Sequence, residues 1–125
     1  MSIVRLALLL LIAVPATASA QSMNAETFYK KARALEAKGP MALLSRDLKL
    51  VMNEGRASFA QARNARLAAI KAGQAPRYCP AAGNKGMGSD EYMKGLAQIP
   101  AAERARITMT EATTRILARK FPCPA

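Results

Sequence analysis

The sequence predicts an all-α protein, a small bundle of about four helices with one long central helix, stapled by one disulfide. Apolar residues recur at spacings of three and four along several segments, and no segment keeps the two-residue alternation of a strand. Capping residues and prolines mark where these segments begin and end. The chain's only two cysteines, Cys79 and Cys123, frame its last part and can tie the C-terminus to the middle of the chain.

The first helix is expected from Ala25 to the Gly-Pro pair at 39–40. Asn24 can cap its start, and glycine followed by proline cannot continue a helix. Phe28, Ala32 and Leu35 recur at spacings that place them on one face. Residues 40–44 are expected to form a short helical turn.

The longest helix is predicted for residues 46–72, between a capping Ser45 and a terminating Gly73. At 1.5 Å per residue it would be about 40 Å long. A helix of that length in a small domain indicates either packing against a second subunit or a solvated far end. Its expected buried stripe, interrupted by Arg66, consists of Leu48, Met52, Gly55, Phe59, Ala62 and Ala69.

Two more helices are expected near the C-terminus. Ser89 is predicted to cap a helix that Pro100 interrupts, and residues 101–105 can form one further turn. The spacing of Thr108 and Glu111 is typical of a capping box, so the last helix should begin there and end before Pro122.

Residues 1–20 have the pattern of a secretory signal peptide. One basic residue precedes the apolar run 6–14, and Ala18, Ser19 and Ala20 fit cleavage before Gln21. An uncleaved anchor is the alternative, although the run is short for crossing a bilayer. We therefore expect a single helical domain over 21–125, located in the periplasm or secreted.

Export affects the interpretation of the two cysteines. Outside the cytosol a cysteine pair usually forms a disulfide, so we predict a bond between Cys79 and Cys123. A free thiol pair and half of a metal site are the alternatives, but a metal site would need further soft ligands that the chain lacks. In the chain-entropy description such a bond constrains the unfolded chain by about 4 kcal/mol.

The chain is strongly basic, with 19 basic and 8 acidic residues and a net charge of +11. We interpret the cations of the long helix as a solvated face rather than a nucleic-acid site, because aromatic residues for base stacking are not interleaved with them. An anionic membrane surface remains open as a partner. These cations are Arg46, Lys49, Arg56, Arg63, Arg66 and Lys71.

A glycine- and proline-rich loop is predicted between the long helix and the helix that follows, over residues 73–88. Its Gly83–Gly86 segment resembles part of a phosphate-binding loop, but the full spacing of that motif is missing. We expect an exposed cationic loop that contacts a partner, with Arg77, Asn84 and Lys85 as the candidate residues.

The sequence gives little support to an enzyme. The chain has no histidine, and its carboxylates lie mostly at expected helix starts, where the helix dipole accounts for them. We expect a non-enzymatic protein with no catalytic residues, no cofactor and no metal site.

Three motifs in order suggest a family. Tyr78-Cys79-Pro80 is followed by Ser-x-Glu-Tyr-Met-x-x-Leu at 89–96 and by Leu-x-x-Lys-Phe-Pro-Cys-Pro at 117–124. In this order and spacing they resemble the Rap/Tai family, periplasmic immunity proteins that protect bacteria from peptidoglycan amidases of type VI secretion. The chain departs from that pattern because residues 51–59 contain no cysteine, so it resembles a divergent member with a single disulfide.

The resemblance implies a helical protein, often a homodimer, that inhibits a cell-wall amidase by occupying its cleft. Only the two cysteines are carried over from the family as site residues. We therefore expect an exported binding protein with a protein partner. If the family resemblance extends to function, that partner is a cell-wall amidase effector. The alternative is a cationic periplasmic protein that binds anionic envelope surfaces or acts as a stress chaperone.

Overall fold

The structure is a computed structural model that describes residues 23–125, so the expected signal peptide lies outside the described residues. The all-α prediction is confirmed: the described part of the chain contains helices and loops, with one isolated β-bridge between Asn24 and Thr108. None of the helices in this part is both long and apolar enough to cross a membrane. The elements are α1 (Ala25–Lys38), η1 (Gly39–Leu44), α2 (Arg46–Lys71), α3 (Ser89–Gln98), α4 (Ala101–Arg104) and α5 (Met109–Lys120).

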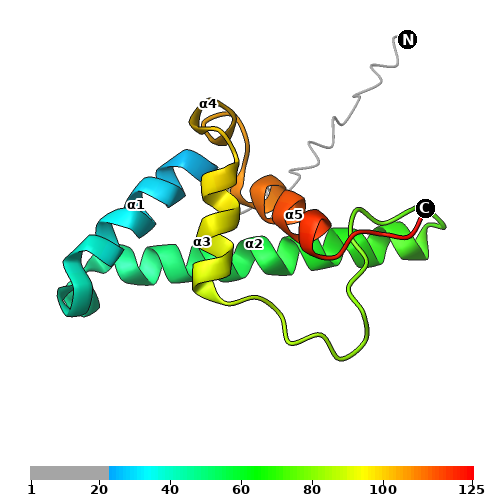
Figure 1. The fold of residues 1–125 in the computed structure, drawn as a ribbon, viewed down its shortest axis with the longest axis horizontal. Coiled ribbons are helices and arrows are strands. Elements are labelled where there is room, and N and C mark those ends of the chain that lie inside the picture. The colour runs from blue at the N-terminus through cyan, green and yellow to red at the C-terminus, as the bar shows by residue number, and fades with distance from the viewer. Residues whose placement is uncertain (1–22) are drawn as a thin grey trace, which may run out of the picture.

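The long helix α2 organises the molecule. It packs against α1 at one end and against α5 further along, while α3 packs against both α1 and α5 (Figure 1). The loop after α2 runs back from its far end to the start of α3 (Figure 1). Toward the far end of α2, Leu67 and Ile70 are 44% and 50% exposed, so this part of the helix is partly solvated.

The buried face of α2 is rotated relative to the predicted stripe. Val51, Ser58 and Ala62 are buried, whereas Met52, which was expected in the core, is 48% exposed. Ser58 and Ala62 are small, so they allow α5 to approach closely. Apolar spacing alone did not reveal this because serine is not counted in an apolar stripe.

A polar chain crosses the core where α2, α3 and α5 meet. The hydroxyls of Tyr92 and Thr113 are 2.6 Å apart, Thr113 donates to Ser58 Oγ at 2.9 Å, and Ser58 donates to the Gly55 carbonyl at 2.7 Å. Burial raises the pKa of the Tyr92 phenol. These bonds satisfy the hydroxyls that the close α2–α5 packing removes from water.

Most of the predicted helix starts are confirmed. Asn24, Ser45 and Thr108 accept hydrogen bonds from backbone N–H groups in the first turns of α1, α2 and α5. Ser89 does not cap: it is the first residue of α3, and Gly88 precedes it without a side-chain bond. Acidic residues in the first turn of α3 still complement the helix dipole there.

Arg104 is buried, which the sequence did not indicate. Its side chain is 8% exposed, pairs with Glu26 at 2.6 Å and donates to the carbonyls of Leu96 and Ile99. Its guanidinium also lies 4.1 Å from the centre of the Tyr29 ring. Arg104 thereby joins the α3–α4 connection to α1.

Candidate functional site

The cysteine-framed segment is fastened by the predicted disulfide. Cys79 and Cys123 are bonded, with Cα atoms 4.8 Å apart, which confirms the bond and removes the free-thiol and metal alternatives for this pair. The Cys79 N–H also donates to the Phe121 carbonyl at 2.8 Å. The loop is therefore fixed near its middle, at Cys79, to the segment that follows α5.

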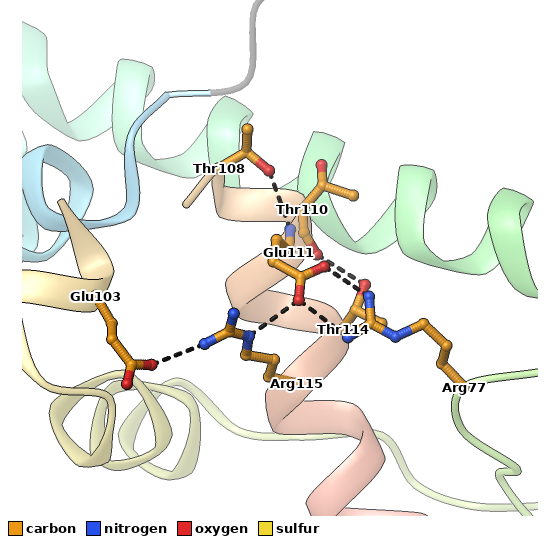
Figure 2. Close-up of polar contacts among 7 residues, drawn as sticks. All are labelled: Arg77, Glu103, Thr108, Thr110, Glu111, Thr114 and Arg115. Atoms are coloured by element: carbon orange, nitrogen blue, oxygen red, sulfur yellow. Dashed lines mark hydrogen bonds and ion pairs between the residues drawn. The ribbon is translucent and has the colours of Figure 1, made fainter. Parts of the chain in front are cut away.

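Arg77, a predicted partner-contact residue, is held in an ion-pair cluster around Glu111 (Figure 2). It donates to both carboxylate oxygens, at 2.6 and 3.0 Å, while Arg115 donates to one of them at 2.9 Å and also binds Glu103. The hydrogen bond from Arg77, with help from Arg115, lowers the pKa of Glu111 to about 2. The Glu111 carboxylate thus stabilises the loop against α5, and Arg77 has an intramolecular role.

The other two predicted loop residues differ from each other. Asn84 shapes the turn: its side chain donates to the Ala81 carbonyl at 3.1 Å and accepts the Gly86 N–H at 2.9 Å. Lys85 is exposed and has no hydrogen bond or ion pair within residues 23–125. Of the three, Lys85 is the side chain most available to a partner.

Two arginines of α2 line an open hollow under the loop, which we call the arginine hollow. Arg63 and Arg66 border it, Tyr78 and Phe121 contribute aromatic rings, and its volume is about 520 Å³. The Arg66 guanidinium lies 5.4 Å from the centre of the Tyr78 ring. The remaining lining residues are Phe59, Ala60, Pro80, Asn84, Gly86, Met87 and Leu117.

Arg66 lacks a complete set of partners. Its Nε is buried, yet no hydrogen-bond acceptor reaches it. Neither Arg63 nor Arg66 forms an ion pair with a carboxylate in the described part of the chain. Two guanidinium groups without a carboxylate partner therefore border the hollow, which makes it a favourable place for an anion.

A second hollow, of about 740 Å³, lies between α1, α2 and the start of α3, and we call it the apolar hollow. Its wall on α2 includes Val51, Met52 and Phe59, and its wall on α1 includes Phe28 and Leu35. Charged side chains also border it, namely Glu36, Arg56 and Asp90.

The two hollows are neighbours on one flank of α2. Phe59 of α2 and Met87 of the loop line both. Five of the residues that α2 contributes to the two hollows are spaced alternately by four and three, which places them on one side of the helix. They are Met52, Arg56, Phe59, Arg63 and Arg66.

Except for Met52, this flank lies in a stretch of the sequence without acidic residues. Between Glu54 and Asp90 the chain carries six basic residues and no carboxylate. Glu111 neutralises Arg77 from outside the stretch, which leaves the cations of α2 and Lys85 unopposed. The sequence shows the charges, but not that folding adds the aromatic rings of Tyr78 and Phe121 beside them.

An exposed apolar corner joins α1 to α2. Met41, Leu43 and Leu44 of η1 are 63%, 77% and 79% exposed, and we call these three residues the apolar corner. Ala42, between them, lines the apolar hollow. Sequence reasoning predicted a helical turn here but not that it would leave three large side chains in solvent.

No group of three potential metal ligands is present among residues 23–125. The titratable groups with shifted pKa values are held by structural contacts, as Glu111 is by Arg77 and Tyr92 is by burial.

No protein-family model matches the chain, and neither a curated protein nor a solved structure matches it significantly.

Proposed function

We propose that this protein is an exported, non-enzymatic binding protein that inhibits a protein partner. In the specific version the partner is a cell-wall amidase of type VI secretion, as the resemblance to immunity proteins implies. The disulfide supports export, because such bonds persist in oxidising compartments.

The observation that carries the proposal is the apolar corner. Large apolar side chains exposed together on a small protein are typical of interaction surfaces. Met41, Leu43 and Leu44 lie next to one another in η1, and each is more than half exposed. A partner that covers them would remove this apolar surface from water and so gain binding free energy.

The proposal is tested by co-producing the exported chain with each secreted cell-wall hydrolase encoded beside it. We expect one such hydrolase to be neutralised and to bind the purified chain. The variants Leu43→Ser and Leu44→Ser should weaken that binding at least about ten-fold, as for a central interface residue. Leu67→Ser, the same change at an exposed site on α2, is the matched control.

Two outcomes would count against the proposal. The first is failure to protect against, or bind, every neighbouring hydrolase. The second is an equal loss of binding in Leu67→Ser and in the corner variants. Circular dichroism should show unchanged helicity in all three variants, because the replaced side chains are exposed.

A homodimer is another way to cover the corner. In that case sedimentation at increasing concentration would show a dimer that Leu43→Ser and Leu44→Ser dissociate. A dimer that both variants leave intact would place the contact elsewhere.

A second function, binding to anionic envelope surfaces, is favoured by the acid-free cationic stretch. It predicts adsorption to anionic vesicles that weakens as salt rises, because salt screens exposed charges. Charge reversal at Arg63, Arg66 and Lys71 should abolish the adsorption. Binding that does not respond to salt would argue against this function.

A further inference from the structure

We propose that the flank of α2 is a binding groove for one anionic amphiphile, whose acyl chain occupies the apolar hollow and whose headgroup binds Arg63 and Arg66. This ligand site does not depend on the protein partner proposed above, since the apolar corner carries that proposal. It also differs from adsorption to a membrane surface, because one molecule would enter the groove.

The first support is that the two hollows adjoin at two shared lining residues and differ chemically. Phe59 and Met87 line both, so a ligand that passes these two side chains touches an apolar wall at one end and two guanidinium groups at the other. Met87 is flexible and stands on the loop between Gly86 and Gly88, which allows its side chain to move aside.

The second support is that the two arginines at the cationic end lack carboxylate partners. Arg66 has a buried Nε without an acceptor, and Arg63 has no ion pair among the described residues. The Tyr78 ring beneath the Arg66 guanidinium holds it by a cation–π contact but supplies no hydrogen-bond acceptor for its N–H groups. A carboxylate or phosphate supplies those acceptors in the bidentate geometry that arginine favours.

The third support is length. Met52 and Arg63 are eleven residues apart on the same flank, about 16 Å along the helix axis. One acyl chain spans half of a bilayer's hydrocarbon core, about 15 Å. A single chain therefore reaches from the arginines to the far wall of the apolar hollow.

Charge complementarity selects this ligand over a cationic one. No carboxylate lines the arginine hollow, and most of its lining residues come from the stretch between Glu54 and Asp90 that contains no acidic residue. The acidic residues Glu36 and Asp90 border only the apolar hollow, away from the proposed headgroup site.

The test is calorimetric titration of the purified chain, residues 21–125 with the disulfide intact, with single-chain amphiphiles below their micelle-forming concentrations. Dodecanoate and dodecyl phosphate carry the two possible anionic headgroups, and dodecyltrimethylammonium reverses the charge. Inorganic phosphate tests the headgroup without a chain. We expect saturable binding of one anionic amphiphile per chain, and binding at least about ten-fold weaker for inorganic phosphate and for the cationic amphiphile. The tighter of dodecanoate and dodecyl phosphate identifies the headgroup.

Variants separate the two ends of the groove. Arg63→Gln together with Arg66→Gln should weaken binding of the anionic amphiphile at least about ten-fold. Arg63→Gln alone should weaken binding several-fold. Arg63 is exposed, so this variant remains informative if the loss of Arg66 disturbs folding. Met52→Asp places a charge against the acyl chain and should weaken binding as well.

The matched control is Arg46→Gln with Lys49→Gln, which removes the same charge from exposed sites on α2 that line neither hollow. Equal weakening by this control would show general electrostatic attraction and overturn the proposal. Equal affinity for the cationic amphiphile would overturn it too. If the chain adsorbs to phosphatidylglycerol vesicles but binds no single amphiphile, the proposal is overturned and the flank binds a membrane surface instead.

Discussion

The Glu111 cluster gives a prediction whose size and pH dependence both follow from the structure. Replacing Glu111 by Gln keeps the side-chain volume and leaves the cap intact, because Thr108 accepts the backbone N–H of residue 111 rather than its side chain. The variant loses the charged partner of Arg77 and Arg115. We expect a less stable protein at neutral pH, with the loop held less tightly to α5.

The magnitude comes from the pKa of Glu111. Its fall from the ordinary 4.5 to about 2 corresponds to about 3 kcal/mol in favour of the charged form. The Glu111 side chain is 32% exposed and Arg77 is 57% exposed, so solvent screens part of this interaction. We therefore expect the variant to lose about 1–2 kcal/mol of unfolding free energy at pH 7.

The sign of the pH dependence follows from the lowered pKa. The Glu111 contribution is complete above the unfolded pKa near 4.5, and protonation removes it as the pH falls toward 2. The difference between wild type and Glu111→Gln should therefore shrink over that interval.

The assay is urea unfolding followed by circular dichroism at pH 7, 4, 3 and 2. Glu36→Gln is the control, because Glu36 pairs with Arg33 on an exposed face of α1 and should change stability by less than about 0.5 kcal/mol. A stability difference that stays constant from pH 7 to pH 2 would refute the assignment of the lowered pKa to Glu111.

Three variants test the packing. Replacing Cys79 and Cys123 by Ser should lower the unfolding free energy by about 4 kcal/mol, measured by urea unfolding, because the bond closes a loop with a sequence separation of 44; a loss below about 1 kcal/mol would contradict this. Gly95→Ala should lower the melting temperature despite the better helix propensity of alanine, because the new Cβ would lie 2.9 Å from Ile116 Cγ2. Gly55→Ala on α2, where the nearest atom lies at 3.9 Å, should raise the melting temperature; the reverse order of the two glycine variants would show that the α3–α5 contact is not tight.

The helices could be predicted because their signals are local. Asn24, Ser45 and Thr108 cap the helices that their positions indicated, and the Gly-Pro break at 39–40 separates α1 from α2. Capping and chain termination depend on neighbouring residues, so the sequence contains the necessary information.

The candidate binding surfaces were not predictable in the same way. Arg77 and Lys85 look alike in a cationic loop, but folding brings Glu111 to Arg77 and no carboxylate to Lys85. Met52 looks like a core residue and lies on a half-open wall instead. These differences depend on contacts between residues distant in sequence, which no local spacing encodes.

The sequence by itself determined the helical class, the element order and the partners of the disulfide, because periodicity, caps and a count of two cysteines are sufficient for each. Only the tertiary structure decided which face of α2 is buried, because that choice depends on the hydroxyls of Thr113 and Tyr92 meeting Ser58. The tertiary structure also showed that the segment between the two cysteines and its neighbouring residues line the arginine hollow. Tyr78 and Pro80, on either side of Cys79, line the arginine hollow together with Phe121, and the Tyr78 ring lies beside the Arg66 guanidinium.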